Sequence, residues 1–392
     1  MTPKPSVDLG PTLGGLAAVT LVAALLYGAL AHQSLNRALT ATRALHRQRV
    51  ASHGPRPAPR PALAPDAPCN THAALATALR ERPLPPFEGT AFRSLFAAET
   101  LPPRDAETLA ALGPTLDALE AAARCTATSH RRVGSPDPHP NLVTLRWLLL
   151  RARFAPAAAC VPHLLAYLRL SDDPTVEGDL VGLALSGALA DELRAAVTLC
   201  LDRGPEAPSL GQREALAAML RDPLPIGPAL AREVLSLSGD VDRGLPVALG
   251  LPDSAAALTL WRTARQLVDG WRRALDLVPV LAATPPTVTA TDAAARSLVN
   301  AFGDDALLSL SPATLESVLR SARRGRTLRR MAALALGAAD PALTRDACRD
   351  GATISRRETA DRRVIFHSDG ALPGDPRDDI ELSAPMWPLP RD

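Results

Sequence analysis

The sequence predicts an all-α protein with an N-terminal transmembrane helix, an irregular or repeat-like helical body and a small C-terminal β element. Three observations lead to this fold class. Residues 12–31 are an uncharged run of the length that spans a bilayer core as a helix. Apolar residues then recur every three or four positions through most of the chain, which is typical of amphipathic helices. Segments with strand character are confined to residues 354–382.

The first element is a tail of residues 1–11 followed by the apolar run at 12–31. Ala29-Leu30-Ala31 has the A-x-A form of a signal-peptidase site, so one interpretation is a cleaved signal peptide. The run is longer than a usual signal-peptide core, and Asp8 offsets Lys4 in the short segment before it. These features favour a retained single-pass anchor, which binds membrane lipid through this helix.

A basic helix is expected next, at residues 32–51, with leucines at near-helical spacing. Its arginines precede the first acidic residue of this region, Asp66: Arg37, Arg43, Arg47 and Arg49. The positive-inside rule would place the body in the cytoplasm, and the arginines could bind anionic lipid headgroups. The alternative is that they form the solvated face of a helical extension.

Residues 52–68 are dense in proline and predict an extended stalk, and the helical body follows at residues 69–350. Asp173-Pro174, Thr291 and Ser311 have the residue types that begin helices. Residues 284–291 are a Pro/Thr loop and a candidate sub-domain boundary. Helices are expected at 71–82, 90–99, 104–124 with a break at 113–114, 141–154, 156–170, 173–203, 209–221, 227–237, 254–283, 291–302 and 312–339. In the C-terminal tail, residues 351–392, short strands are expected at 354–357, 364–367 and 380–382.

Composition excludes several classes of function. The 43 basic and 41 acidic residues give a net charge of +2, and aromatic residues are 3% of the chain, so nucleic acid is not an expected partner. Lys4 is the only lysine, so the body has no Schiff-base lysine, Walker A lysine or kinase-type lysine. The sequence shows no motif for a small-molecule substrate, and HExxH, GxSxG and GxGxxG are absent.

The five cysteines form neither a CxxC pair nor a zinc-type cluster with histidine. Cys160 and Cys200 fall on apolar helix faces and are expected to be small buried hydrophobic residues. Cys69 and Cys125 lie near loops and could pair in an exported protein, but the sequence alone does not assign the connectivity.

Two segments resemble known proteins. Residues 141–202 (NLVTLRWLLLRARF, then HLLAYLRLSDDPTVEGDLVGLALSGALADEL) resemble a group of uncharacterised, membrane-anchored helical proteins of GC-rich bacteria, whose members pair such a body with a short β tail. The tail RRVIFHSDGALPGDPRDDIEL, residues 362–382, resembles that tail and also the C-terminal loop of type II secretion pseudopilins, YSLGADGxPGG…DI. It is shorter before Asp369-Gly370 and lacks the double glycine, and the chain lacks the GFTLxE processing motif. The resemblance implies an exported body and an envelope location rather than a reaction.

Two sets of residues are candidate sites. Asp369, Asp375 and Asp379 lie in a glycine-containing loop that could bind calcium, as the resembling pseudopilin loop does, and the alternative is a solvated acidic turn. The densest basic cluster could bind an acidic partner or lipid, or be a solvated helix face. It comprises Arg320, Arg323, Arg324, Arg326, Arg329 and Arg330, to which the membrane-proximal Arg43, Arg47 and Arg49 are added. No cofactor other than calcium is indicated.

The expected function is therefore that of a membrane-tethered helical interaction or scaffold protein of the bacterial cell envelope. It would bind a protein partner that the sequence does not name, and it would not be an enzyme. Two alternatives stay open: an envelope hydrolase with a dispersed catalytic set, and an accessory component of a secretion or pilus-like apparatus. The expected location is the inner membrane, with the body placed outside by the resemblance and inside by the arginines.

Overall fold

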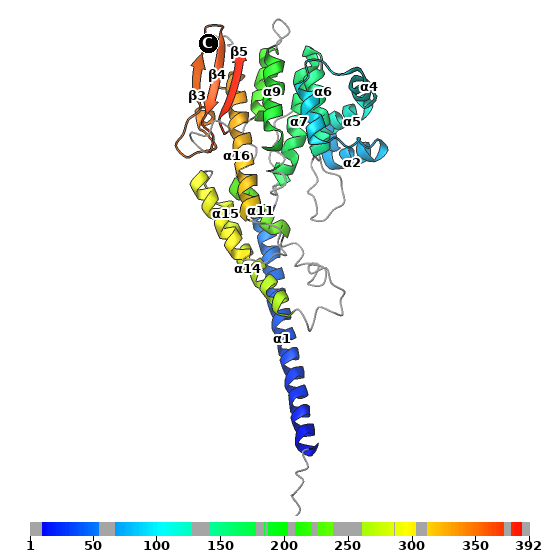
Figure 1. The fold of residues 1–392 in the computed structure, drawn as a ribbon, viewed down its shortest axis with the longest axis vertical. Helices are drawn as coiled ribbons and strands as arrows, with labels where there is room; N and C mark the ends of the chain where they lie inside the picture. Colours follow the sequence, from blue (N-terminus) through cyan, green and yellow to red (C-terminus); the bar gives the residue numbers. More distant parts are fainter. Residues whose placement is uncertain are drawn as a thin grey trace, which may run out of the picture.

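The computed structural model is mostly helical and ends in a three-stranded antiparallel sheet (Figure 1). Its described residues are 10–54, 67–127, 142–177, 184, 187–202, 208–220, 226–237, 261–285, 287–302, 312–371 and 378–385. Buried apolar side chains of these residues gather in two clusters. The head core contains α2 to α10, the second half of α16 and the sheet, and the stem core contains α1, α11, α14, α15 and the first half of α16.

Helix α1 (Gly10–His53) is continuous through the apolar run and the basic segment, and its first half extends away from the rest of the molecule (Figure 1). We find no helix in the described part of the chain that combines the length and the apolar character needed to cross a membrane. The transmembrane part of the predicted fold class is therefore not supported. Within residues 12–28 the structure describes the helical backbone, but only the side chains of Val22 and Leu26.

The second half of α1 is built into the stem core. Leu35 and Leu39 are buried against α11 (Ile226–Leu237) and α14 (Trp261–Ala282). His46 forms a hydrogen bond with the carbonyl oxygen of Leu235 at 3.1 Å. The predicted basic helix is thus a packed element, because its leucines return to one face every four residues and dock on other helices. The Pro-rich segment at 55–66 lies outside the described residues.

Helix α14 passes through Pro279 and ends one turn later, at Ala282. A proline inside a helix often ends or kinks it, because it lacks an N–H, which here would bond to the carbonyl of Leu275. The Nε atom of Arg49, on α1, donates to this carbonyl at 3.2 Å instead. The stem core is completed by α15 (Val288–Phe302) and by the first half of α16 (Pro312–Ala335), and Trp271 is buried in it.

The head core is a pack of short helices whose positions largely agree with the periodicity of the sequence. They are α2 (Thr71–Glu81), α3 (Gly89–Ala97), α4 (Pro103–Ala111), α5 (Gly113–Ala123), α6 (Leu142–Phe154), α7 (Ala157–Glu177), α9 (Ala190–Leu201) and α10 (Leu210–Leu220). Trp147 of α6 stacks on Phe87 with ring centroids 4.4 Å apart, and its Nε1 donates to the carbonyl of Pro85 at 3.2 Å.

The predicted helix start at Asp173-Pro174 is wrong, because α7 continues through both residues and ends at Glu177. Pro174 removes one backbone N–H, which a helix tolerates when it ends within a turn. Apolar residues recur every three or four positions in the predicted helix at 173–203, and those in its second half, Leu193, Val197 and Cys200 of α9, are buried. Leu180 and Leu183, in its first half, lie outside the described residues.

A second sheet was not predicted. Strand β1 (Ala67–Asn70) pairs in parallel with β2 (Cys125–Ala127), at the two ends of the segment that holds α2 to α5. These strands have three and four residues, too few to show an alternating pattern.

The three C-terminal strands are confirmed near their predicted positions: β3 (Ser355–Glu358), β4 (Arg363–Ser368) and β5 (Ile380–Pro385), with β4 in the centre. Val364, Phe366 and Leu382 are buried in the head core, where the sheet lies against α16. Helix α16 therefore runs from the stem core into the head core, and its central residues lie at the junction of the two.

Candidate binding cleft

The predicted basic cluster lies at this junction, in the middle of α16, and its arginines contact several other elements. Arg324 bonds to Asp191 of α9 and to the carbonyl of Asp378, both at 3.3 Å. Arg329 is buried and donates to the Ser171 hydroxyl of α7 at 3.3 Å. These contacts hold the middle of α16 against the head, and a role in partner binding stays a prediction for these residues.

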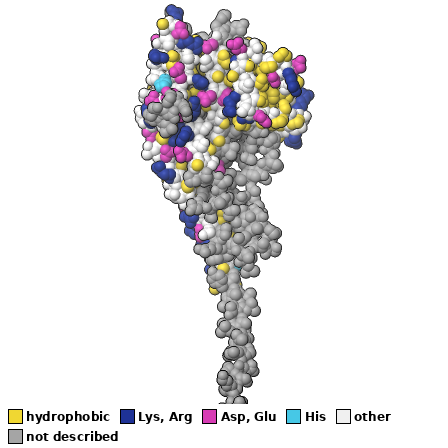
Figure 2. Space-filling view, in the orientation of Figure 1, with side chains coloured by type: hydrophobic (Ala, Val, Ile, Leu, Met, Phe, Trp, Pro, Cys, Tyr) yellow, Lys and Arg dark blue, Asp and Glu magenta, His cyan; other side chains and the backbone are white. Residues whose placement is uncertain are grey.

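The remaining arginines of the predicted set lie in different surroundings. Arg326 is buried, Arg330 donates to the carbonyl of Arg345 at 2.8 Å, and Arg320 pairs with Glu316 one turn earlier at 3.0 Å. On α1, Arg49 bonds to Leu275, and Arg43 and Arg47 also have partners. Figure 2 shows basic and acidic side chains interspersed over the visible face of the head.

Helices α15 and α16 diverge around a cleft of about 520 Å³, within the size range of ligand pockets. Apolar side chains of Ala295, Val299, Leu315 and Leu319 line it. Polar and charged side chains also line it: Asp292, Arg296 and Asn300 from α15, and Glu316, Arg320 and Arg323 from α16. The cleft is thus amphipathic, and it brings together two members of the predicted basic cluster, Arg320 and Arg323.

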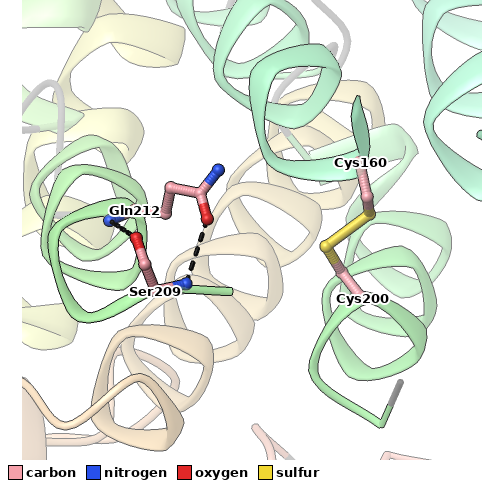
Figure 3. Close-up of a disulfide and its surroundings, with 4 residues drawn as sticks. All are labelled: Cys160, Cys200, Ser209 and Gln212. Atoms are coloured by element: carbon pink, nitrogen blue, oxygen red, sulfur yellow. Dashed lines mark hydrogen bonds between the residues drawn. A yellow bond between two sulfur atoms is a disulfide. The ribbon is translucent and has the colours of Figure 1, made fainter. Parts of the chain in front are cut away.

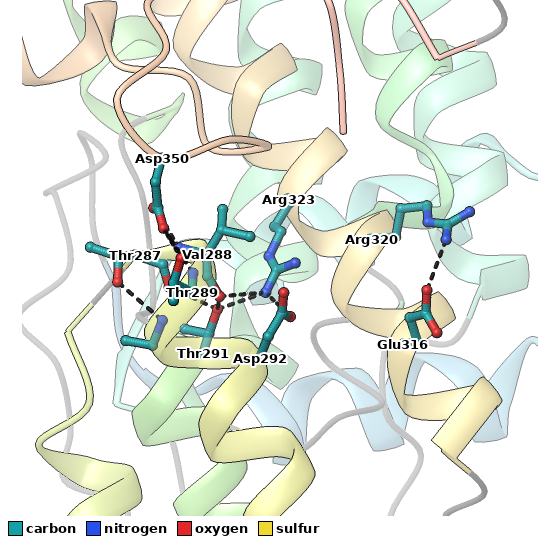
Figure 4. Close-up of polar contacts among 10 residues, drawn as sticks. Thr287, Val288, Thr289, Thr291, Asp292, Glu316, Arg320, Arg323 and Asp350 are labelled. Carbon is teal, nitrogen blue, oxygen red and sulfur yellow. Dashed lines mark hydrogen bonds and ion pairs between the residues drawn. The ribbon is translucent and has the colours of Figure 1, made fainter. Parts of the chain in front are cut away.

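Arg323 joins the two helices at one end of the cleft (Figure 4). Its Nη2 donates to the Oδ1 of Asp292 at 2.6 Å and to the Oγ1 of Thr291 at 2.7 Å. Thr291 was predicted to cap α15, and this is wrong because the helix begins three residues earlier, at Val288. Thr291 is buried inside the first turn, where its hydroxyl accepts from Arg323 and donates to backbone carbonyls.

Two side chains cap the start of α15: the Thr287 hydroxyl accepts from the Ala290 N–H at 3.3 Å, and the second cap is Asp350, far along the chain. Its carboxylate accepts from the backbone N–H of Val288 at 2.7 Å and from that of Thr289 at 2.8 Å, and from the Thr289 hydroxyl (Figure 4). Desolvation alone would raise the pKa of Asp350, but the hydrogen bonds from Thr289 and Val288 outweigh it and hold this pKa below its usual value. Asp350 could not be found from the sequence, because its partners lie 62 and 61 residues earlier in the chain.

A network of buried polar groups surrounds Asp346 and includes Cys348, which lines the cleft. The hydroxyls of Thr327 and Ser368 donate to Asp346 at 2.9 and 2.5 Å, and the Cys348 N–H donates to the same carboxylate at 2.8 Å. Burial raises the pKa of the Cys348 thiol to about 12 against the hydrogen bond with Thr327, and the charge of Asp346 adds to the rise. This thiol, which lines the cleft, is therefore protonated and unreactive at neutral pH.

The predicted calcium site stays a prediction, because the structure describes only two of its three ligands. Asp369 pairs with Arg349 and with His367, each at 3.2 Å. Asp379 is exposed, and Asp375 lies outside the described residues. Among the residues that the structure describes, no group of three or more His, Cys, Asp or Glu side chains is arranged to hold a metal ion.

Cys160 of α7 and Cys200 of α9 form a disulfide, with Cα atoms 6.1 Å apart (Figure 3). Their predicted burial is confirmed, but the expectation that they are free is wrong because the two helix faces bring them together. Cys125 is also disulfide-bonded, and Cys348 is a free thiol. Close to the first disulfide, Ser209 and Gln212 form a reciprocal capping box at the start of α10 (Figure 3).

Among the described residues, polar contacts are formed by His32, His46, His163 and His367. His163 pairs with Glu120 at 2.7 Å, beside Arg151. His130 and His139 lie outside the described residues. Comparison with family models, curated proteins and solved structures gives no match to this chain. The resemblances of residues 141–202 and 362–382 therefore stay predictions, and the site must be interpreted from its own chemistry.

Proposed function

We propose that the protein is a membrane-tethered interaction protein of the bacterial cell envelope, which presents the α15–α16 cleft to a protein partner. Its N-terminal segment holds it at the membrane, its body lies on the extracytoplasmic side, and its mechanism is binding rather than catalysis. The observation that carries the proposal is the continuity of α1, which links the apolar run at 12–31 to the core that forms the cleft.

The free half of α1 supports a tether. Val22, Leu26 and Leu30 follow one another at intervals of four residues, so they lie on one face of the helix. They are 54%, 60% and 65% exposed, although large apolar side chains of this kind are usually buried. An apolar environment outside the chain would stabilise this face, and a membrane provides one.

Disulfides support the extracytoplasmic side. Cys160 and Cys200 are bonded to each other and Cys125 is also bonded. Such bonds persist in oxidising compartments such as the periplasm and are rare in the bacterial cytoplasm. The positive-inside rule would place the body in the cytoplasm. That rule applies to arginines whose side chains are free to face the membrane. Arg49 is hydrogen-bonded to α14, and Arg43 and Arg47 have partners, which weakens its application here.

The cleft supports a protein partner because it combines an apolar floor with polar rims, as interfaces commonly do. Its test is site-specific photo-crosslinking in intact envelopes, with the photoreactive residue at Val299 in the cleft or, as a control, at exposed Leu210 on α10. We expect a discrete adduct of higher mass from Val299 alone, which Ala295→Phe abolishes by filling the cleft. Identical adducts from both positions, or none from Val299, would contradict the proposal.

A further inference from the structure

Strand β3 is an edge strand of the C-terminal sheet, because the only strand it pairs with in the described structure is β4. Figure 1 shows it on the side of the sheet away from α9. The main-chain groups of successive residues in a strand face its two sides alternately. The N–H of Thr359 donates to the carbonyl of Arg363 in β4, so odd-numbered residues of β3 face β4. Arg356 and Glu358 therefore direct their main-chain N–H and carbonyl groups outward.

The chain itself pairs with this outward side just before β3. Residues 344–346 form two main-chain hydrogen bonds with residues 352–354, at 2.7 and 2.9 Å. The pairing stops there because the 3-10 helix η2 (Pro341–Thr344) turns the chain away from an extended path. In the part of the chain that the structure describes, nothing pairs with the edge at Arg356 or Glu358. Such an unpaired edge is a template for a further strand.

A small, mostly apolar cavity lies between the sheet and the end of α16, and it reaches β3. Its volume is about 180 Å³, below that of pockets for drug-sized ligands, so it suits single side chains. Residues 337–339, Val364 and Phe366 contribute to its walls. Arg356 also lines it, because Arg356 lies directly opposite Phe366 and shares the face of the sheet that packs on α16. A side chain on that face of a neighbouring strand would lie next to the cavity.

The charges of β3 indicate which chain can pair with it. All four residues of β3 are exposed, and Arg356 pairs with Glu358 at 2.8 Å. Arg357 is on the opposite face, and it has no hydrogen-bond or ion-pair partner among the described residues. Its guanidinium group would be stabilised by a carboxylate directly across from it on a neighbouring strand.

A second copy of this chain fits the edge poorly. Two antiparallel copies of β3 related by a two-fold axis must place one residue directly opposite its own copy. In the registers that use the outward groups, this residue is Arg356, Arg357 or Glu358, depending on the register. Like charges directly opposite each other are destabilising, so the partner is a different chain.

We propose that β3 accepts an extended segment of another protein as a fourth strand of the sheet. The two residues of the segment that bond to Arg356 and Glu358 direct their side chains toward α16, where an apolar side chain enters the cavity. The residue between them lies opposite Arg357 and is acidic. This surface is separate from the α15–α16 cleft, so the inference goes beyond the proposed function and does not rest on it.

Fluorescence anisotropy on the full chain in detergent tests strand addition, with the labelled, amidated peptide Thr-Leu-Glu-Leu-Thr as probe. We expect saturable binding in which the main chain of both leucines faces β3 and that of the glutamate faces away. N-methylation of either leucine should therefore weaken binding at least about fivefold, because a hydrogen bond to β3 is lost. N-methylation of the glutamate is the matched control and should change the affinity less than about twofold. Equal effects at leucine and glutamate, or no binding of the parent peptide, would overturn the proposal.

Exchanging the charges of both partners tests the role of Arg357. Replacing the peptide glutamate with lysine should weaken binding about fivefold, and Arg357→Glu should reverse this preference so that the lysine peptide binds better. Arg37→Glu on the exposed face of α1 changes the net charge equally and should leave the preference as it is in the wild type. A preference for glutamate that persists in Arg357→Glu would overturn the role of Arg357.

A larger side chain at the cavity tests the apolar contact. Ala339 is exposed and lines the cavity, so Ala339→Phe should weaken the peptide about tenfold because one leucine loses its buried contact. Ala313→Phe, at an exposed position in the first turn of α16, is the control and should bind like wild type. Equal affinities of these two variants would overturn the role of the cavity. A dimer of the chain that the peptide dissociates, seen by light scattering, would overturn the assignment to a different protein.

Discussion

The Nε atom of Arg49 on α1 donates a hydrogen bond to the carbonyl oxygen of Leu275 on α14, at 3.2 Å. This carbonyl lacks its ordinary helical donor because Pro279 follows four residues later and has no N–H. The contact therefore replaces a bond that the sequence of α14 cannot make by itself. This hydrogen bond forms only when α1 is packed against α14. It therefore links the proposed tether to the stem core, which forms the cleft.

Replacing Arg49 with methionine should lower the free energy of unfolding by about 1–2 kcal/mol, because the Leu275 carbonyl is left without its donor. Methionine keeps an apolar stem, so the change isolates the hydrogen bond. Arg37→Met is the matched control on the exposed face of the same helix, with an expected effect within about 0.5 kcal/mol. Urea unfolding followed by circular dichroism measures both, and equal effects would refute the role of Arg49.

Asp350→Ala should destabilise the protein by about 1 kcal/mol, the usual effect of removing a helix cap. Hydrogen bonds hold the pKa of Asp350 in the folded state below its unfolded value of 3.8, despite desolvation. The contribution is therefore complete above the unfolded pKa and is lost as the pH falls through the folded pKa. Unfolding curves should show a constant difference from wild type between about pH 7 and 5, and a shrinking one below about pH 4. A difference that grows on acidification would contradict this assignment.

Gly227 and Gly211 are each the second residue of a helix, which makes them a matched pair. A Cβ atom on Gly227 would lie 2.5 Å from the carbonyl oxygen of Leu281, whereas one on Gly211 would meet open space. Gly227→Ala should therefore destabilise the packing of α11 on α14 by about 1–3 kcal/mol. Gly211→Ala should be neutral or stabilising by up to about 1 kcal/mol. Thermal unfolding of both variants measures this, and the same sign of effect at both positions would contradict the close packing.

Thiol titration distinguishes the states of the five cysteines. Cys160, Cys200 and Cys125 are disulfide-bonded, and Cys348 is a buried free thiol with its pKa raised to about 12. We expect no fast-reacting thiol in the native protein, one after denaturation without reductant and five after reduction. Peptide mapping without reductant checks the pairs. Three thiols in the denatured, unreduced protein would show that only one bridge forms.

The sequence could predict those helices and strands that depend on patterns among neighbouring residues. The helix at 142–154 was found because leucines surround Trp147 at helical spacing, and the strand at 363–368 because the short apolar run Val364 to Phe366 lies between turn residues. These signals reside in neighbouring residues, so they survive without knowledge of the tertiary structure.

The sequence could not predict contacts between residues that lie far apart in the chain. The disulfide joins Cys160 to a residue forty positions away, and Asp350 caps a helix that begins about sixty residues earlier. The end of α14 likewise depends on Arg49, a residue from the other end of the chain. The cleft was missed for the same reason, because its two helices each show an ordinary amphipathic pattern and only their divergence creates it.

We propose that an N-terminal tether holds the body outside the cytoplasm. The most direct test is protease accessibility of the full chain with a C-terminal tag, in intact spheroplasts and after lysis, with membrane fractionation of the same samples. We expect the full-length protein to sediment with the membranes and protease to remove the tag from intact spheroplasts. A tag that is protected until lysis, or a full-length protein that stays in the supernatant, would contradict it.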